Sequence, residues 1–240
     1  MTETVTHAEL RVDSCEAEVR VNDFSIMRLG GGRQSVESQP VPEYLIAGEN
    51  LMEVLVYTEG GMFQARLVEF QLGAFTGSGG NDRIALSNGR ERGTTQLAGD
   101  LARWAWQDCG QLPLSGQTVR DVVELVRSIH AAFVLRNPEP IVAASSIWNQ
   151  ELAIAYPERT AEYFSGQMAH DLVSDANHPA WRVAPLVESE FALRLCAGGR
   201  LVECVDVNGL PLVRSYLGMV PDFLLGMRVG FYQGCYRILR

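Results

Sequence analysis

The chain has 240 residues, enough for one large domain or two small ones, and a chain of this length folds without disulfides or a metal. All 20 basic residues are arginine. The absence of lysine excludes a P-loop, an internal pyridoxal Schiff base and a kinase-type strand lysine. The formal net charge of −9, without any dense basic run, argues against nucleic acid and anionic membranes as partners. An acidic surface suits a basic protein partner, and it also suits simple solubility.

The N-terminal stretch and the cysteines indicate a reducing compartment. Residues 1–7 have neither the positive region nor the apolar core of a secretory signal, and no apolar run reaches the length of a membrane-spanning helix. The cysteines are odd in number and form no C-x-x-C pair; they are Cys15, Cys109, Cys196, Cys204 and Cys235. We therefore predict a cytoplasmic protein with reduced thiols and no transmembrane helix.

Residues 8–72 have the pattern of short strands separated by turns. Residues 18–21 alternate in polarity, Asn22-Asp23 is a turn signal, and the alternation resumes over 24–29. Further strand-like segments lie at 41–46, 51–57 and 63–72. Such a series is typical of an antiparallel sandwich or half-barrel. We predict a β-sandwich module over residues 1–75.

Two segments of this module carry a resemblance to a known family. The run from Glu18 to Phe24, followed by the run from Val41 to Val56, resembles the galactose-binding-like jelly rolls attached to many glycosidases. In those domains a strand ends in Asn-Gly and a Leu-x-x-Gly-x-Asn-x-x-x-Val segment follows; here Asp23 stands in place of the usual Gly. The motif shapes a turn and a strand, so the resemblance implies a fold rather than an activity. Carbohydrate binding by this module is kept as an alternative function.

Residues 76–116 are rich in glycine and lose hydrophobic periodicity, apart from a short helix expected over 97–106. We therefore predict a linker region with a domain boundary inside it. From residue 117 the period becomes helical, with Val122, Val126, Ile129 and Phe133 on one face. Thr118 is the expected N-cap of this first helix. Pro138 starts a second helix that runs to about Tyr156, and Pro157 opens a third.

The period returns to two after residue 182. Gly198-Gly199 predicts a hairpin turn, and the register that it sets places Arg194 opposite Glu203. The same register puts Cys196 and Cys204 on opposite faces, which excludes a disulfide between them. A second turn signal, Asn208-Gly209, places Arg214 opposite Glu203 as well. We therefore predict a three-stranded meander, and a last strand over 229–239.

Three helices followed by a curved antiparallel meander resemble the nuclear-transport-factor-like cone fold. The likeness covers residues 117–217 and concerns the order of elements. It implies an apolar pocket between helices and sheet; some members of that family are dehydratases or isomerases with an Asp or His in the cone, and many others only bind ligands or proteins. We predict an α+β chain: a small antiparallel β-sandwich, then a three-helix domain with a curved antiparallel sheet over 117–240.

The candidate pocket residues all have a structural alternative. His130, on the apolar helix face, is either a general base or a hydrogen-bonded core residue. Asp206 falls on the apolar face of the hairpin, where a buried carboxylate could abstract a proton, but it also adjoins the Asn208-Gly209 turn. Trp148, Tyr156 and Tyr163 either line a pocket or pack in a helical core. No catalytic motif, metal-ligand set or cofactor motif is recognisable, so we predict no catalytic residue, metal or cofactor.

These observations favour a non-catalytic binding protein with a protein partner. An immunity or secretion-accessory role in a bacterium fits this expectation. Two alternatives stay open: a small-molecule isomerase or dehydratase that uses a pocket in the C-terminal domain, and a carbohydrate-binding protein. An enclosed pocket with two convergent ionisable groups would favour the enzyme.

Overall fold

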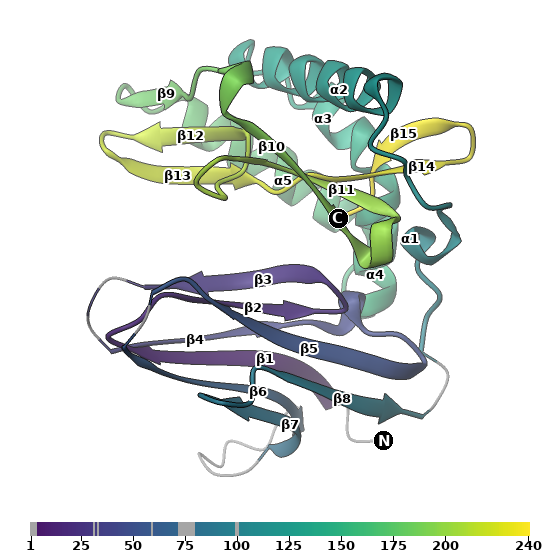
Figure 1. Cartoon of the computed structure of the whole chain (residues 1–240). Helices are drawn as coiled ribbons and strands as arrows, with labels where there is room; N and C mark the ends of the chain where they lie inside the picture. Colours follow the sequence, from purple (N-terminus) through teal and green to yellow (C-terminus); the bar gives the residue numbers. More distant parts are fainter. Residues whose placement is uncertain (1–3, 31, 33, 59, 72–79, 99–100) are drawn as a thin grey trace. The chain divides into compact units, whose positions relative to one another are not determined.

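A computed structural model describes residues 4–30, 32, 34–58, 60–71, 80–98 and 101–240 (Figure 1). The chain divides into two compact units, Met1–Arg103 and Trp104–Arg240. The dividing point lies inside the stretch 76–116 that the sequence indicated as a linker region. Each unit has its own hydrophobic core.

The first unit is an antiparallel β-sandwich, as predicted. Its two sheets have the strand orders β4-β1-β6-β7 and β3-β2-β5-β8, and they face one another in Figure 1. The strands are β1 (Thr4–Asp13), β2 (Ala17–Val21), β3 (Phe24–Leu29), β4 (Ser35–Pro40), β5 (Gly48–Val56), β6 (Met62–Gln71), β7 (Asn81–Ser87) and β8 (Arg92–Leu97), with a 3-10 turn at Pro42–Tyr44.

Strict alternation along β1 separates the core of the sandwich from its surface. Ala8, Leu10 and Val12 are fully buried in the core between the sheets. Successive side chains of a strand point to opposite faces, so Glu9 and Arg11 lie on the outer face of their sheet. This outer face carries a hollow lined in part by Arg11.

The two asparagines of the jelly-roll-like motif hold the turn between β2 and β3. Asn22 and Asp23 have φ values of 49° and 69°, as a tight hairpin turn requires. The Asn22 amide donates to the Oδ1 of the fully buried Asn50 at 2.7 Å. Asn50 in turn accepts from the Ile46 N–H at 2.9 Å and donates to the Ile46 carbonyl at 2.7 Å. These residues therefore have a structural role.

The stretch 76–116 contains two strands, β7 and β8, where the sequence indicated a linker. β8 was not recognisable because its sequence, RGTTQL, has no apolar alternation. Its pairing with β5 defines it, with Leu51 opposite Thr94. Gly93 marks a close approach, since a Cβ there would lie 2.9 Å from Ile84. The glycine that suggested a linker is needed for packing.

The α-helices of the second unit precede all of its described strands. They are α1 (Ala105–Asp108), α2 (Gly116–Val134), α3 (Glu139–Ala144), α4 (Ser146–Ala155) and α5 (Ala161–Ala176). The predicted buried face of α2 is confirmed, with Val122, Val126, Ile129 and Phe133 in the core. The N-cap is Ser115 rather than Thr118, because the Ser115 hydroxyl accepts from the Thr118 N–H.

The helix expected from Pro138 to Tyr156 is divided at Ser145. Its backbone (φ −95°, ψ 9°) ends α3 and begins α4. The expected third helix begins at Ala161 instead of Pro157, after Thr160, whose hydroxyl accepts from the Tyr163 N–H at 3.2 Å. This four-residue delay leaves residues 157–160 as a connection between α4 and α5.

Two antiparallel sheets complete the second unit, and α2 lies along one side of them in Figure 1. Their orders are β10-β11-β14-β15 and β13-β12-β9. The strands are β9 (Trp181–Val183), β10 (Phe191–Cys196), β11 (Leu201–Asp206), β12 (Val213–Leu217), β13 (Val220–Leu225), β14 (Arg228–Tyr232) and β15 (Cys235–Ile238), with 3-10 turns at Glu188–Glu190 and Ala197–Gly199.

The predicted register of the β10–β11 hairpin is confirmed, because Arg194 pairs with Glu203. The predicted meander is wrong. Glu203 faces Arg228 of β14 on its other side, and β12 pairs with β9 and β13 in the second sheet. After β11 an isolated bridge pairs Val205 with Pro211, and the Leu212 N–H donates to the Cys204 carbonyl at 3.3 Å. Proline has no N–H with which to extend a ladder, so β12 departs to the other sheet.

The α+β class is thus confirmed, while the last predicted strand is a hairpin of β14 and β15. No helix in the described part of the chain is long and apolar enough to cross a membrane. The five cysteines are free, and only Cys235 is exposed.

Candidate functional site

His130 lies on α2 and forms a hydrogen bond to the backbone of another segment. The side chain is half-buried, and its Nε2 lies 2.8 Å from the carbonyl oxygen of Ala184. A carbonyl oxygen only accepts, so Nε2 carries the proton and donates. The bond ties α2 to the segment that follows β9.

Asp206, at the end of β11, caps the turn that follows it. Its Oδ1 accepts from the N–H groups of Asn208 at 2.8 Å and Leu210 at 3.0 Å. Its Oδ2 lies 2.9 Å from Nη2 of Arg214, and the side chain is buried. Arg214, expected opposite Glu203, is therefore the ion-pair partner of Asp206. These contacts of Asp206 hold the turn and Arg214, and none of them involves His130.

Trp148 packs against the core of the second unit from α4. Its indole Nε1 is buried and has no hydrogen-bond partner among the residues that the structure describes. The ring supplies apolar contact area to that core.

Tyr156 and Tyr163 are brought together where α4 connects to α5. Both contact Phe164, with ring centroids 6.2 Å and 5.5 Å away. The guanidinium of Arg159 lies 4.9 Å from the centre of the Tyr163 ring, and Tyr163 is 45 % exposed. Aromatic side chains and arginine are the residues most enriched in protein interfaces. This group is therefore a surface cluster suited to contact with another protein.

A hollow of about 410 Å³ lies between α3 and α5. Small side chains leave this space open: a Cβ on Gly166 would meet nothing within 4 Å. Apart from Glu139 and Ser165, the lining is apolar. The lining residues are Pro138, Glu139, Val142, Ala143, Ser165, Gly166 and Ala169.

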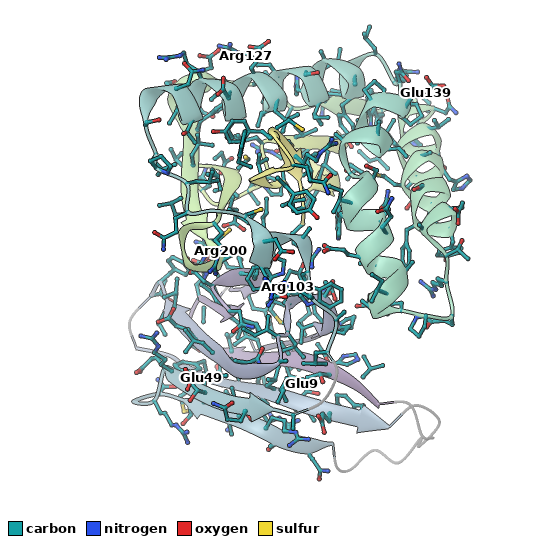
Figure 2. All side chains as sticks on the ribbon, turned by 90° about the vertical axis from the view of Figure 1, so that its right-hand side faces the viewer. Glu9, Glu49, Arg103, Arg127, Glu139 and Arg200 are labelled. Atoms are coloured by element: carbon teal, nitrogen blue, oxygen red, sulfur yellow. The ribbon has the colours of Figure 1, made fainter. Side chains whose placement is uncertain are left out.

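The segment that forms this hollow is strongly acidic. Residues 139–176, which we call the helical layer, contain six acidic residues and one arginine, a net charge of −5. The acidic residues are Glu139, Glu151, Glu158, Glu162, Asp171 and Asp175. Glu139, labelled in Figure 2, points away from the helices and is exposed. The backbone N–H of Glu162, and then the Thr160 hydroxyl, hold the pKa of the Glu162 carboxyl below its usual value, so it stays charged over a wide pH range.

The buried charge of the helical layer was not found from the sequence. The carboxylate of Glu151 accepts from Nη1 of Arg240 and from the N–H of Ala105. The guanidinium of Arg240 lies 5.2 Å from the centre of the Trp104 ring and is fully buried. The two residues are 89 positions apart, so no local pattern could have indicated the pair.

Two buried cysteines, Cys109 and Cys204, have thiols that stay protonated near neutral pH. Burial raises the pKa of the Cys109 thiol to about 11, and burial raises that of Cys204 further. Among the residues with described positions, no three His, Cys, Asp or Glu side chains gather as metal ligands would.

Comparisons with protein-family models, curated proteins and solved structures found no match for this chain. Of the five candidate pocket residues, the structure joins Tyr156 and Tyr163 and gives the other three separate packing or hydrogen-bonding positions. The apolar hollow was missed because it depends on how α3 packs on α5.

Proposed function

We propose that this chain is a non-catalytic binding protein whose helical layer binds a basic protein partner. The supporting observation is the combination of an apolar hollow with an acidic segment, whose net charge is −4 once the buried Glu151, which pairs with Arg240, is left out. The hollow can take an apolar side chain of the partner, which supplies affinity. The carboxylates attract basic side chains, which increases the association rate and selects the partner.

The contacts of the two ionisable candidates support a non-catalytic role. An isomerase or dehydratase needs at least two convergent ionisable groups in an enclosed pocket. His130 is bonded to Ala184, and Asp206 to its own turn and to Arg214. Neither lines the hollow between α3 and α5.

The finer identity of the two folds is part of the same proposal. A galactose-binding-like sandwich and a nuclear-transport-factor-like cone would both suit a binding protein, since many proteins with the second fold only bind ligands or proteins. A cytoplasmic immunity or secretion-accessory role in a bacterium would bring such a chain into contact with a protein partner.

Two variants of the helical layer test the proposal. Gly166→Trp fills the hollow at a position where the backbone leaves room for a side chain. Glu139→Arg combined with Glu162→Arg reverses charge on both helices that line it. Matched controls on α2 are Ser128→Trp and Glu124→Arg, both at exposed positions. Each protein is used as bait in its native host, and the partners bound by wild type are identified by mass spectrometry and then purified.

We expect a partner with a basic surface, with affinity reduced roughly tenfold or more by either helical-layer variant and unchanged by the controls. Salt should weaken the complex, because exposed charges are screened. An acidic partner, or one that binds both helical-layer variants as tightly as wild type, would contradict the proposal.

A further inference from the structure

The outer face of the β4-β1-β6-β7 sheet carries a hollow of about 530 Å³, within the size range of small-molecule sites. It lies in the first unit and shares no residue with the helical layer. Its lining residues are Arg11, Asp13, Gln34, Met62, Phe63, Gln64, Ser87 and Asn88. A neighbouring hollow of about 360 Å³ on the same face shares Arg11 and Gln64 with it.

The strand register sets a row of directly opposed residues that crosses this hollow from β4 to β7, and one residue of that row is charged. Arg11 of β1 lies opposite Val36 of β4 and Gln64 of β6, and Gln64 lies opposite Ser87 of β7. Directly opposed side chains are near neighbours, so Arg11 has only uncharged cross-strand neighbours.

In the neighbouring row of opposed residues, an arginine does form ion pairs. Glu9 lies opposite Arg66 and forms an ion pair with it, and Arg66 also lies 3.3 Å from Asp82 (Glu9 is labelled in Figure 2). With the Gln34 side-chain amide turned so that its oxygen faces Arg11, that oxygen accepts from Nε of Arg11 at 2.9 Å and also from Nη2. Among the described residues, no carboxylate is within ion-pair distance of Arg11. The hollow therefore contains a guanidinium that forms no ion pair with a described residue, although the Asp13 carboxylate lines the same hollow.

The other groups around Arg11 define what could bind there. Asp13 lies two residues along the same strand and can accept a hydrogen bond from a ligand hydroxyl or ammonium group. Gln64 and Ser87 can donate hydrogen bonds. Met62 is 65 % exposed and offers apolar contact. Asn88 holds the wall in place, since it accepts from the Phe63 N–H and donates to the Gly61 carbonyl, both at 2.8 Å.

We propose that this hollow binds a small carboxylic acid that carries hydroxyl or amino groups. The ligand carboxylate pairs with Arg11, whose planar guanidinium suits the two oxygens of a carboxylate. A hydroxyl or ammonium group beside the carboxylate donates to Asp13. The site is independent of the protein-binding function proposed above, because it lies in the other unit.

The test is a titration of the full chain with candidate ligands at constant ionic strength, monitored by two-dimensional amide NMR. D-gluconate and D-sorbitol form a matched pair, since they differ only in a carboxylate in place of a CH2OH group. L-glutamate replaces hydroxyl donors with an ammonium group, and inorganic phosphate tests for unspecific anion binding. The variants are Arg11→Gln, Asp13→Asn and, as a control, Arg92→Gln at an exposed arginine of β8.

We expect saturable shifts in β1, β4 and β6 with gluconate or glutamate, and much weaker shifts with sorbitol and phosphate. Arg11→Gln should weaken binding roughly tenfold or more, while Arg92→Gln leaves it unchanged. Asp13→Asn separates the two ligand types, because it should weaken an ammonium ligand more than a hydroxyl ligand. Equal binding of gluconate and sorbitol, equal binding of phosphate, or full binding to Arg11→Gln would overturn the proposal. So would the absence of saturable shifts with both carboxylates.

Discussion

Truncation of Glu151 should destabilise the second unit far more than truncation of an exposed carboxylate. Glu151 and Arg240 are both buried, and the carboxylate also accepts from the Ala105 N–H. Glu151→Ala leaves a buried guanidinium without its counter-charge and an amide without its acceptor. Breaking a buried pair from one side costs about 3–5 kcal/mol. Folded domains have a free energy of unfolding of about 5–15 kcal/mol, so the second unit of the Glu151→Ala variant would be only marginally stable.

Tryptophan fluorescence during urea unfolding isolates this effect. The four tryptophans, Trp104, Trp106, Trp148 and Trp181, all belong to the unit that begins at residue 104. The signal therefore follows the unit in which the pair is buried. The matched control is Glu188→Ala, which breaks the exposed pair between Glu188 and Arg127 and should change the free energy of unfolding far less, because water screens exposed charges.

Two further variants keep the prediction testable if Glu151→Ala does not fold. Glu151→Gln keeps the size and an acceptor oxygen, so it should cost less than the alanine variant. Glu151→Leu combined with Arg240→Met removes both charges and should recover most of the stability, as replacing buried pairs by apolar residues often does. A loss for Glu151→Ala no larger than that for Glu188→Ala would refute the reasoning, because it would mean that water reaches the pair.

Three other outcomes follow from the same contacts. Asp206→Ala should lower the free energy of unfolding by about 2–4 kcal/mol in the fluorescence assay, because it removes a turn cap and the partner of Arg214; a loss below about 0.5 kcal/mol would contradict the structural role. At pH 8 a thiol reagent should label Cys235 rapidly and the other cysteines only after denaturation; rapid native labelling of Cys109, whose pKa burial raises to about 11, would contradict its environment. NMR titration should give His7 a pKa below 6.5, because burial disfavours its charged form. The stability contributed by neutral His7 is therefore present above pH 6.5 and is lost as the pH falls toward the pKa of the folded state. A pKa above 6.5 would mean that the nearby Glu9 charge outweighs burial.

The sequence alone determined the features that depend on local periodicity. Alternation and turn residues were sufficient for the sandwich class, for the Asn22-Asp23 turn and for the β10–β11 register. The helical period was sufficient for the buried face of α2. In each case the hydrophobic pattern and the backbone preference point to the same local structure, which is why they can be read from neighbouring residues.

Tertiary structure alone decided which distant segments meet. β8 is a strand because β5 pairs with it, and β12 joins β9 and β13 although a turn signal pointed back to β11. The pairing of Glu151 with Arg240 and the absence of an ion pair between Arg11 and the described residues arise in the same way. Both depend on side chains that long-range packing brings close or keeps apart, and the energy of such contacts is invisible in any local window of sequence.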